Sequence, residues 1–143
     1  MHDGRQAGVM KSTKKRFKAQ LAIVERMAED LQWLAGEVAL LDEVFQLASE
    51  VSRLAQILSD KAAECAKHDF AERMRQESAF ARLESFVDVD LVSVVEERFA
   101  KASAGGGQES ILALLAALLE KLERRYADLL LGIRQLSDLL NAD

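Results

Sequence analysis

Between Leu112 and Leu140, apolar residues recur at alternating intervals of three and four. An α-helix completes a turn in about 3.6 residues, so this spacing places all of them on one narrow stripe of a single helix. The members of the stripe are Leu112, Leu115, Leu119, Leu122, Tyr126, Leu129, Ile133, Leu136 and Leu140. Because the stability of such a helix comes mainly from burying its apolar stripe, the segment is predicted to pack against other helices.

The composition favours helices throughout the chain. Its 143 residues include no proline, a residue that removes a backbone donor and breaks helix interiors. Three of the seven glycines form the run 105–107, which predicts a turn. We therefore predict an all-α fold, an antiparallel helical bundle of three to four long helices with coiled-coil-like packing. Residues 12–143 are predicted to form this one domain, and residues 1–11, which lack a helical period, a disordered basic arm.

Other segments of the chain show the same helical spacing. Ser12 or Thr13 can cap a first helix, and a capping pair at Asp69 and Glu72 predicts the start of another. The β-branched stretch 86–90 predicts an interruption, after which Asp90 caps the next turn. The predicted core positions are Phe17, Val24, Met27, Leu31, Leu34, Val38, Leu41, Phe45, Ala48, Val51, Ala55, Leu58, Ala62, Cys65, Phe70, Met74, Phe80, Leu83, Val87, Leu91, Val94, Val95 and Phe99.

Gly36 decides between two arrangements of the first half of the chain. It can end one helix before a second begins, which gives four helices in an up-and-down bundle. Alternatively, one helix continues from about 13 to 66, because a glycine inside a helix costs only about 1 kcal/mol. The apolar stripe crosses Gly36 in register and no capping residue follows it directly. Both arrangements stay open, and the continuous stripe favours the long helix.

The last helix has more apolar surface than one packing stripe needs. Leu118, Leu130 and Leu131 broaden the stripe, and Leu114, like Leu131, lies away from it. A helix that is apolar on several sides occupies a bundle centre or contacts a second chain. We therefore predict a non-enzymatic protein-interaction module of the adaptor, chaperone or scaffold type that also binds itself, most simply as a homodimer. The predicted interaction residues are Leu115, Leu122, Tyr126, Leu129 and Leu136.

The charge is unevenly distributed along the chain. The first 18 residues carry six basic side chains and one acidic one, while the remainder carries 13 basic and 23 acidic side chains. The acidic remainder argues against broad contact with nucleic acid, which needs a positive surface. The basic arm supports an alternative function, an accessory protein that binds nucleic acid or an anionic membrane. Its possible anion-binding residues are Lys11, Lys14, Lys15, Arg16 and Lys18.

A metal-binding bundle is a weaker alternative. Glu64 and His68 lie four residues apart, so on one helix they share a face, with the thiol of Cys65 beside them. No fourth ligand is visible, and a surface Glu–His pair next to a buried thiol explains the same residues. We therefore predict no metal, no cofactor and no catalytic residue.

The sequence also bears on the compartment. A single cysteine, Cys65, cannot form an internal disulfide, which fits a reducing environment. No apolar run is long enough to span a bilayer, and no apolar segment follows the basic residues near the N-terminus as in a secretory signal. The cytoplasm is the predicted location.

Overall fold

The computed structural model describes residues 2–36, 41–105 and 109–141, and within these ranges the side chains other than those of 2–12, 92, 98, 102–103, 110–112 and 115. Every regular element in these ranges is a helix. The elements are α1 (His2–Gly36), α2 (Asp42–Glu64), the 3-10 turn η2 (Lys67–Asp69), α3 (Phe70–Arg75), α4 (Ser78–Ser85), the 3-10 turn η3 (Phe86–Asp88), α5 (Leu91–Ala104) and α6 (Glu109–Asn141). The all-α helical bundle predicted from the sequence is confirmed, although the described part has six α-helices, three of them long.

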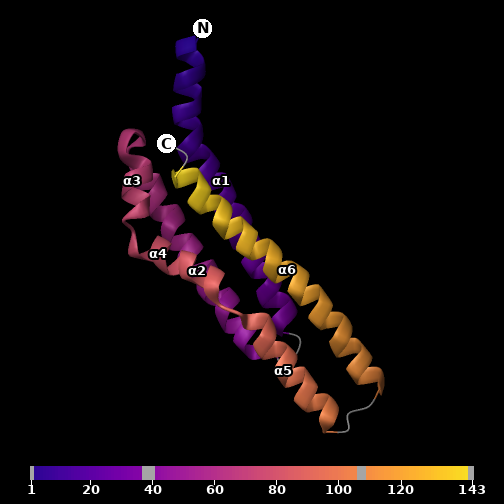
Figure 1. Ribbon diagram of the computed structural model, residues 1–143. Helices are drawn as coiled ribbons and strands as arrows, with labels where there is room; N and C mark the ends of the chain where they lie inside the picture. The colour runs from indigo at the N-terminus through magenta and orange to yellow at the C-terminus, as the bar shows by residue number, and fades with distance from the viewer. Residues whose placement is uncertain (1, 37–40, 106–108, 142–143) are drawn as a thin grey trace.

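Helices α1 and α2 pack side by side in opposite directions (Figure 1). Near one end of the pair, the Gln32 amide donates a 2.5 Å hydrogen bond to Ser49 Oγ. Near the other end, Lys14 Nζ donates a 2.8 Å bond to the carbonyl of Cys65. The continuous helix from 13 to 66 that the stripe favoured is therefore wrong, and the alternative with a break after Gly36 is correct.

In the sequence, the start of α2 after Gly36 is marked by acidic residues rather than by a capping side chain. Helix α2 begins with Asp42 and Glu43, whose negative charges are favourable at the positive end of the helix dipole. Leu41 precedes them without a side-chain capping bond. Residues 37–40, which include the predicted core position Val38, lie outside the described residues. At its other end, α1 begins at His2, ahead of the start predicted at Ser12 or Thr13.

Helix α6 runs along α1, also in the opposite direction. The Gln20 amide nitrogen lies 3.0 Å from Gln135 Oε1 and 3.3 Å from the carbonyl of Gly132. A methyl group at Gly132 would lie 3.2 Å from Cγ2 of the buried Val24, tighter than ordinary van der Waals contact. The missing side chain therefore permits the close approach of the two helices.

Three short helices stand where the spacing predicted one helix with a kink. The predicted interruption at 86–90 is confirmed as η3 and an extended Val89. Asp90 then caps α5, because its carboxylate accepts bonds from the Ser93 amide at 3.2 Å and from Ser93 Oγ at 2.7 Å. A further break between α3 and α4 was not predicted. Asp69 precedes the start of α3, but it forms no side-chain capping bond. The prediction that Asp69 and Glu72 form a capping pair is therefore wrong.

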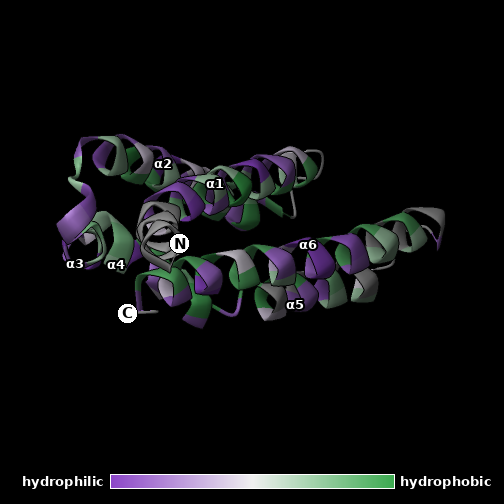
Figure 2. Cartoon of the chain, turned by 90° about the horizontal axis from the view of Figure 1, so that it is seen from above, coloured by the Kyte–Doolittle hydropathy of each residue, from purple (hydrophilic) through white to green (hydrophobic). Residues whose placement is uncertain are grey.

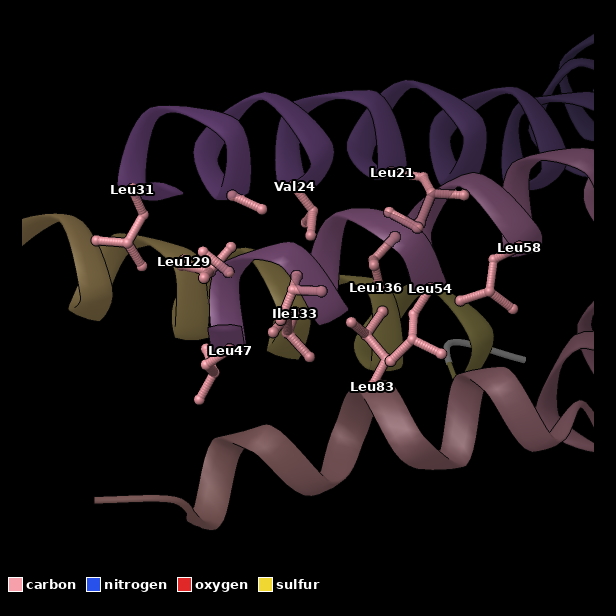
Figure 3. Close-up of a cluster of buried hydrophobic side chains, with 14 of the residues drawn as sticks. Leu21, Val24, Leu31, Leu47, Leu54, Leu58, Leu83, Leu129, Ile133 and Leu136 are labelled. Atoms are coloured by element: carbon pink, nitrogen blue, oxygen red, sulfur yellow. The ribbon is translucent and has the colours of Figure 1, made fainter. Parts of the chain in front are cut away.

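The core is one continuous apolar cluster between the helices. Figure 3 shows side chains of α6, including Leu129, Ile133 and Leu136, gathered with Leu31 of α1 and Leu83 of α4. At the end near the chain termini, the rings of Phe17 and Phe70 meet edge to face at 5.4 Å. No polar or charged residue is buried among those whose side chains are described. Burial of this apolar area is what holds the bundle together.

The predicted core agrees closely with the observed one. Its buried members include Phe17, Val24, Leu31, Leu34, Leu41, Ala48, Val51, Ala55, Leu58, Ala62, Cys65, Phe70, Met74, Phe80, Leu83, Leu91 and Val95. Met27, Phe45 and Val87 are partly buried and pack against this cluster.

Candidate interaction surface

Four of the five predicted interaction residues of α6 lie inside the bundle. Leu122, Leu129 and Leu136 have no exposed surface, and Tyr126 is 3% exposed. The side chain of Leu115 lies outside the described ones. The chain's own helices therefore cover these positions, and a partner reaches them only if the bundle opens. Any contact made by the closed bundle uses other residues.

Among the described side chains of α6, two large apolar ones are exposed, and both lie away from the stripe in the sequence. Leu114 is 62% exposed and Leu131 is 54% exposed. On α1 the exposed apolar side chains include Trp33, at 70%. Isolated exposed apolar residues are common on protein surfaces, so their surroundings decide whether they matter.

Leu114 lies on a part of α6 that extends beyond α1. Gln20 of α1 contacts Gln135 of α6, and the Asp30 carboxylate of α1 lies 3.7 Å from the Arg125 guanidinium of α6. Ten residues forward along α1 therefore match ten residues backward along α6. By this register, Gly36 at the end of α1 is level with about residue 119. Residues 109–118 therefore project about 15 Å beyond α1, at about 1.5 Å per residue. Figures 1 and 2 show this projection.

Helix α5 accompanies α6 along the projection. Its main helix–helix contacts among the described elements are with α6. The apolar side chains Val94 and Phe99 of α5 and Leu118 and Leu119 of α6 are half-buried. We call residues 97–104 and 109–119 the overhang. The overhang is formed by α5 and α6. Its apolar side chains continue the core of the bundle, but α1 and α2 do not cover them there.

Tyr126 fixes the base of α5. Its hydroxyl donates a 2.8 Å hydrogen bond to the carbonyl of Val89. Burial raises the pKa of Tyr126 to about 12, and the negative charge of Asp90 adds to the effect. The phenol therefore remains a hydrogen-bond donor far into the alkaline range.

Two carboxyl groups face each other between α5 and α6. The side chain of Glu123 hydrogen-bonds that of Glu96, and this contact is the main reason that the pKa of Glu123 is raised. Burial and the charges of Glu96 and Glu120 act in the same direction. The spacing of residues in the sequence does not predict this pair, because only the register of α5 on α6 brings Glu96 and Glu123 together.

The predicted anion-binding residues do not all have the same surroundings. Lys14 is partly buried and bonds the Cys65 carbonyl, so it holds α1 to the end of α2. Lys15, Arg16 and Lys18 are exposed around the fully buried Phe17. The side chain of Lys11 lies outside the described ones. Three of the five predicted anion-binding residues are thus exposed.

The alternative metal site lacks the helical spacing on which it rested. Helix α2 ends at Glu64, and His68 lies in η2, so the two residues do not share a helix face. Cys65 is buried with its sulfur 3.9 Å from that of Met74, whereas Glu64 and His68 are exposed. Among the described residues, no three His, Cys, Asp or Glu side chains are placed to hold a metal ion.

Within the described residues, none of the helices combines the length and apolarity that crossing a bilayer requires. No protein-family model, no curated protein and no solved structure matches the chain.

Proposed function

We propose that this protein is a non-enzymatic interaction module whose contact surface is the overhang. The observation that carries the proposal is the exposure of Leu114 on a stretch of α6 that α1 does not cover. Half-buried Leu118 and Leu119 continue this apolar surface toward the core. The contact mode is packing of helix against helix, in which apolar residues repeated every three or four positions enter a complementary groove.

The partner that we propose is a second copy of the chain. Each overhang supplies two antiparallel helices, and two overhangs together make a four-helix layer that covers the apolar sides of both. Closed two-fold dimers are the commonest assemblies of identical chains. The buried stripe of α6, with Leu122, Leu129 and Leu136, serves in this proposal as the support of the surface rather than as the surface itself.

Sedimentation equilibrium of two matched variants tests the proposal. Leu114→Asp places a charge on the overhang, and Leu131→Asp places the same charge on an equally exposed position of α6 outside it. The wild type and Leu131→Asp are expected to associate as the concentration rises, whereas Leu114→Asp remains a monomer. A monomeric wild type, or equal weakening by both substitutions, contradicts the proposal.

A second candidate function uses the three exposed bases at the other end of α1. Lys15, Arg16 and Lys18 offer three exposed positive charges on one turn of α1 to nucleic acid or to an anionic membrane. Deleting residues 1–18 does not test this function cleanly, because it also removes the core residue Phe17. Replacing the three bases by glutamate keeps Phe17, and it should abolish salt-sensitive binding to DNA or to anionic vesicles. Unchanged binding excludes this candidate. The cytoplasm as compartment remains a prediction based on the single cysteine.

A further inference from the structure

A hollow of about 400 Å³ opens on the surface of the α1–α2 pair, near the end of α1 and the beginning of α2 (Figure 1). The residues that line it are Glu29, Gln32, Trp33 and Gly36 of α1 and Phe45 of α2. The four residues of α1 follow one another at intervals of three, one and three, so they lie on one face of the helix. The hollow shares no residue with the overhang.

Two aromatic side chains line the hollow. Trp33 is 70% exposed, the largest fraction among the exposed large apolar side chains that the structure describes. Phe45 is half-buried and packs against the core. A methyl group at Gly36 would lie 3.7 Å from the Phe45 ring, so the missing side chain leaves this side of the ring open to the hollow. The electron-rich faces of indole and phenyl rings attract organic cations.

The polar side chains of the hollow also suit a positive ligand. Glu29 is exposed, and within the described part of the chain no basic side chain forms an ion pair with its carboxylate. The Gln32 amide nitrogen donates its 2.5 Å bond to Ser49 Oγ, which leaves the carbonyl oxygen of Gln32 as an acceptor. In the sequence, residues 25–43 carry six acidic side chains and one basic one. Charge complementarity at this end of α1 therefore favours a cation.

We propose that this hollow binds an organic cation, an alkylammonium or a guanidinium group. The cation lies against the rings of Trp33 and Phe45, and the Glu29 carboxylate balances its charge. Two sources offer this chemistry, a free ammonium compound such as choline and a lysine or arginine side chain of a partner. Because the hollow lies on α1 and α2, the binding does not depend on association through the overhang.

The fluorescence of Trp33 at low protein concentration tests the site, since this is the one tryptophan of the chain. At constant ionic strength, choline is expected to change the fluorescence saturably, with half of the effect at about 1–10 mM. The uncharged isostere of choline, in which a carbon replaces the nitrogen, should give no saturable change.

Two short capped peptides, one with a single arginine and one with glutamine in its place, identify the source of the cation. Saturation by choline alone assigns a free ammonium compound, and saturation by the arginine peptide alone assigns a side chain of a partner. Saturation by both supports the shared chemistry. The proposal is overturned if neither cation saturates, or if the uncharged isostere or the glutamine peptide binds as tightly as its charged counterpart.

Three variants locate the binding while keeping Trp33 as the reporter. Glu29→Gln removes the counter-charge and Phe45→Leu removes one ring, so each should weaken cation binding about twofold to fivefold. Glu25→Gln is the matched control, because it removes a carboxylate of the same helix one turn earlier, outside the hollow, and should bind like the wild type.

Circular dichroism checks that Phe45→Leu, at a position packed against the core, remains folded. Glu29→Gln changes an exposed side chain and decides the question even if Phe45→Leu does not fold. Equal weakening by Glu25→Gln and Glu29→Gln would indicate attraction by the acidic surface in general, and it overturns the proposal.

Discussion

At the scale of single residues, Gly132 matters because it has no side chain where α1 and α6 approach each other. Its Cα hydrogen points at the fully buried Val24 on α1, a β-branched residue with little rotamer freedom. Next to it, the carbonyl of Gly132 is contacted by the amide of Gln20. The sequence places Gly132 in the last helix, but only the packed structure identifies the helix that approaches it.

Gly132→Leu is expected to destabilise the bundle by about 2 kcal/mol or more, because the added side chain forces α1 away from α6. The gain of about 1 kcal/mol from replacing a helical glycine does not offset this cost. Urea unfolding followed by circular dichroism measures the difference. Gly36→Ala is the control, since a methyl group there meets the Phe45 ring at an ordinary 3.7 Å and should not lower the stability. A Gly132→Leu protein as stable as the wild type contradicts the close packing of α1 and α6.

Tyr126→Phe is expected to cost about 1 kcal/mol at neutral pH, through loss of the hydrogen bond to Val89. The raised pKa adds a second expectation. Because the folded phenol ionises only near 12 and the unfolded one near 10.0, the wild type loses stability as the pH rises through this interval. The phenylalanine variant does not lose stability in this way. The stability difference between the two proteins should therefore shrink or reverse above about pH 10. Denaturant unfolding across this range is the measurement, and a constant difference contradicts the buried phenol.

At the scale of elements, sequence patterns predicted helices better than the breaks between them. The stripe of α6 is buried from Leu122 to Leu140, in agreement with the packing that its spacing predicted. The spacing could not decide Gly36, because a stripe that continues in register fits one long helix and two helices packed on each other equally well. Packing of α2 on α1 buries both halves of the stripe, which a single extended helix cannot do. The break between α3 and α4 has no proline or glycine to announce it.

Asp90→Ala tests the start of α5. The aspartate accepts two bonds from Ser93, and these bonds lower its pKa. The alanine variant is therefore expected to lose amide protection in the first turn of α5 while α2 keeps its protection. In the wild type, the lowered pKa means that the contribution of the cap is present above about pH 3.8 and disappears as the pH falls through the lowered value. Unchanged exchange in α5 of the variant contradicts the capping role.

At the scale of the whole molecule, the all-α bundle followed from the sequence and the proposed interaction surface did not. The stripe of α6 predicted that its leucines pack against other helices, and Leu122, Leu129, Leu136 and Leu140 are buried. The stripe does not say whether the same chain or a second one covers them. That depends on the relative lengths and register of the helices, which leave Leu114 beyond the end of α1. The contact between Glu96 and Glu123 depends on the same register.

Trp33 reports on assembly, because it is the one tryptophan of the chain and is 70% exposed. At low protein concentration its fluorescence is expected to have the maximum of a water-exposed indole and to be quenched efficiently by acrylamide. Since Trp33 lies outside the overhang, association through the overhang should leave the quenching unchanged as the concentration rises. Protection that develops with concentration would place the interface on α1 instead.

The buried leucines of the α6 stripe belong to the core of a single chain, whereas the exposed leucines of the same helix do not. Thermal unfolding of Leu129→Asp and Leu114→Asp, followed by circular dichroism, tests this difference most directly. Leu129→Asp places a charge in the core, which costs more than about 4 kcal/mol, so this variant is expected to lose the cooperative transition, whereas Leu114→Asp at low concentration should unfold like the wild type. A Leu129→Asp protein that unfolds at the wild-type temperature would contradict the burial of the stripe within one chain.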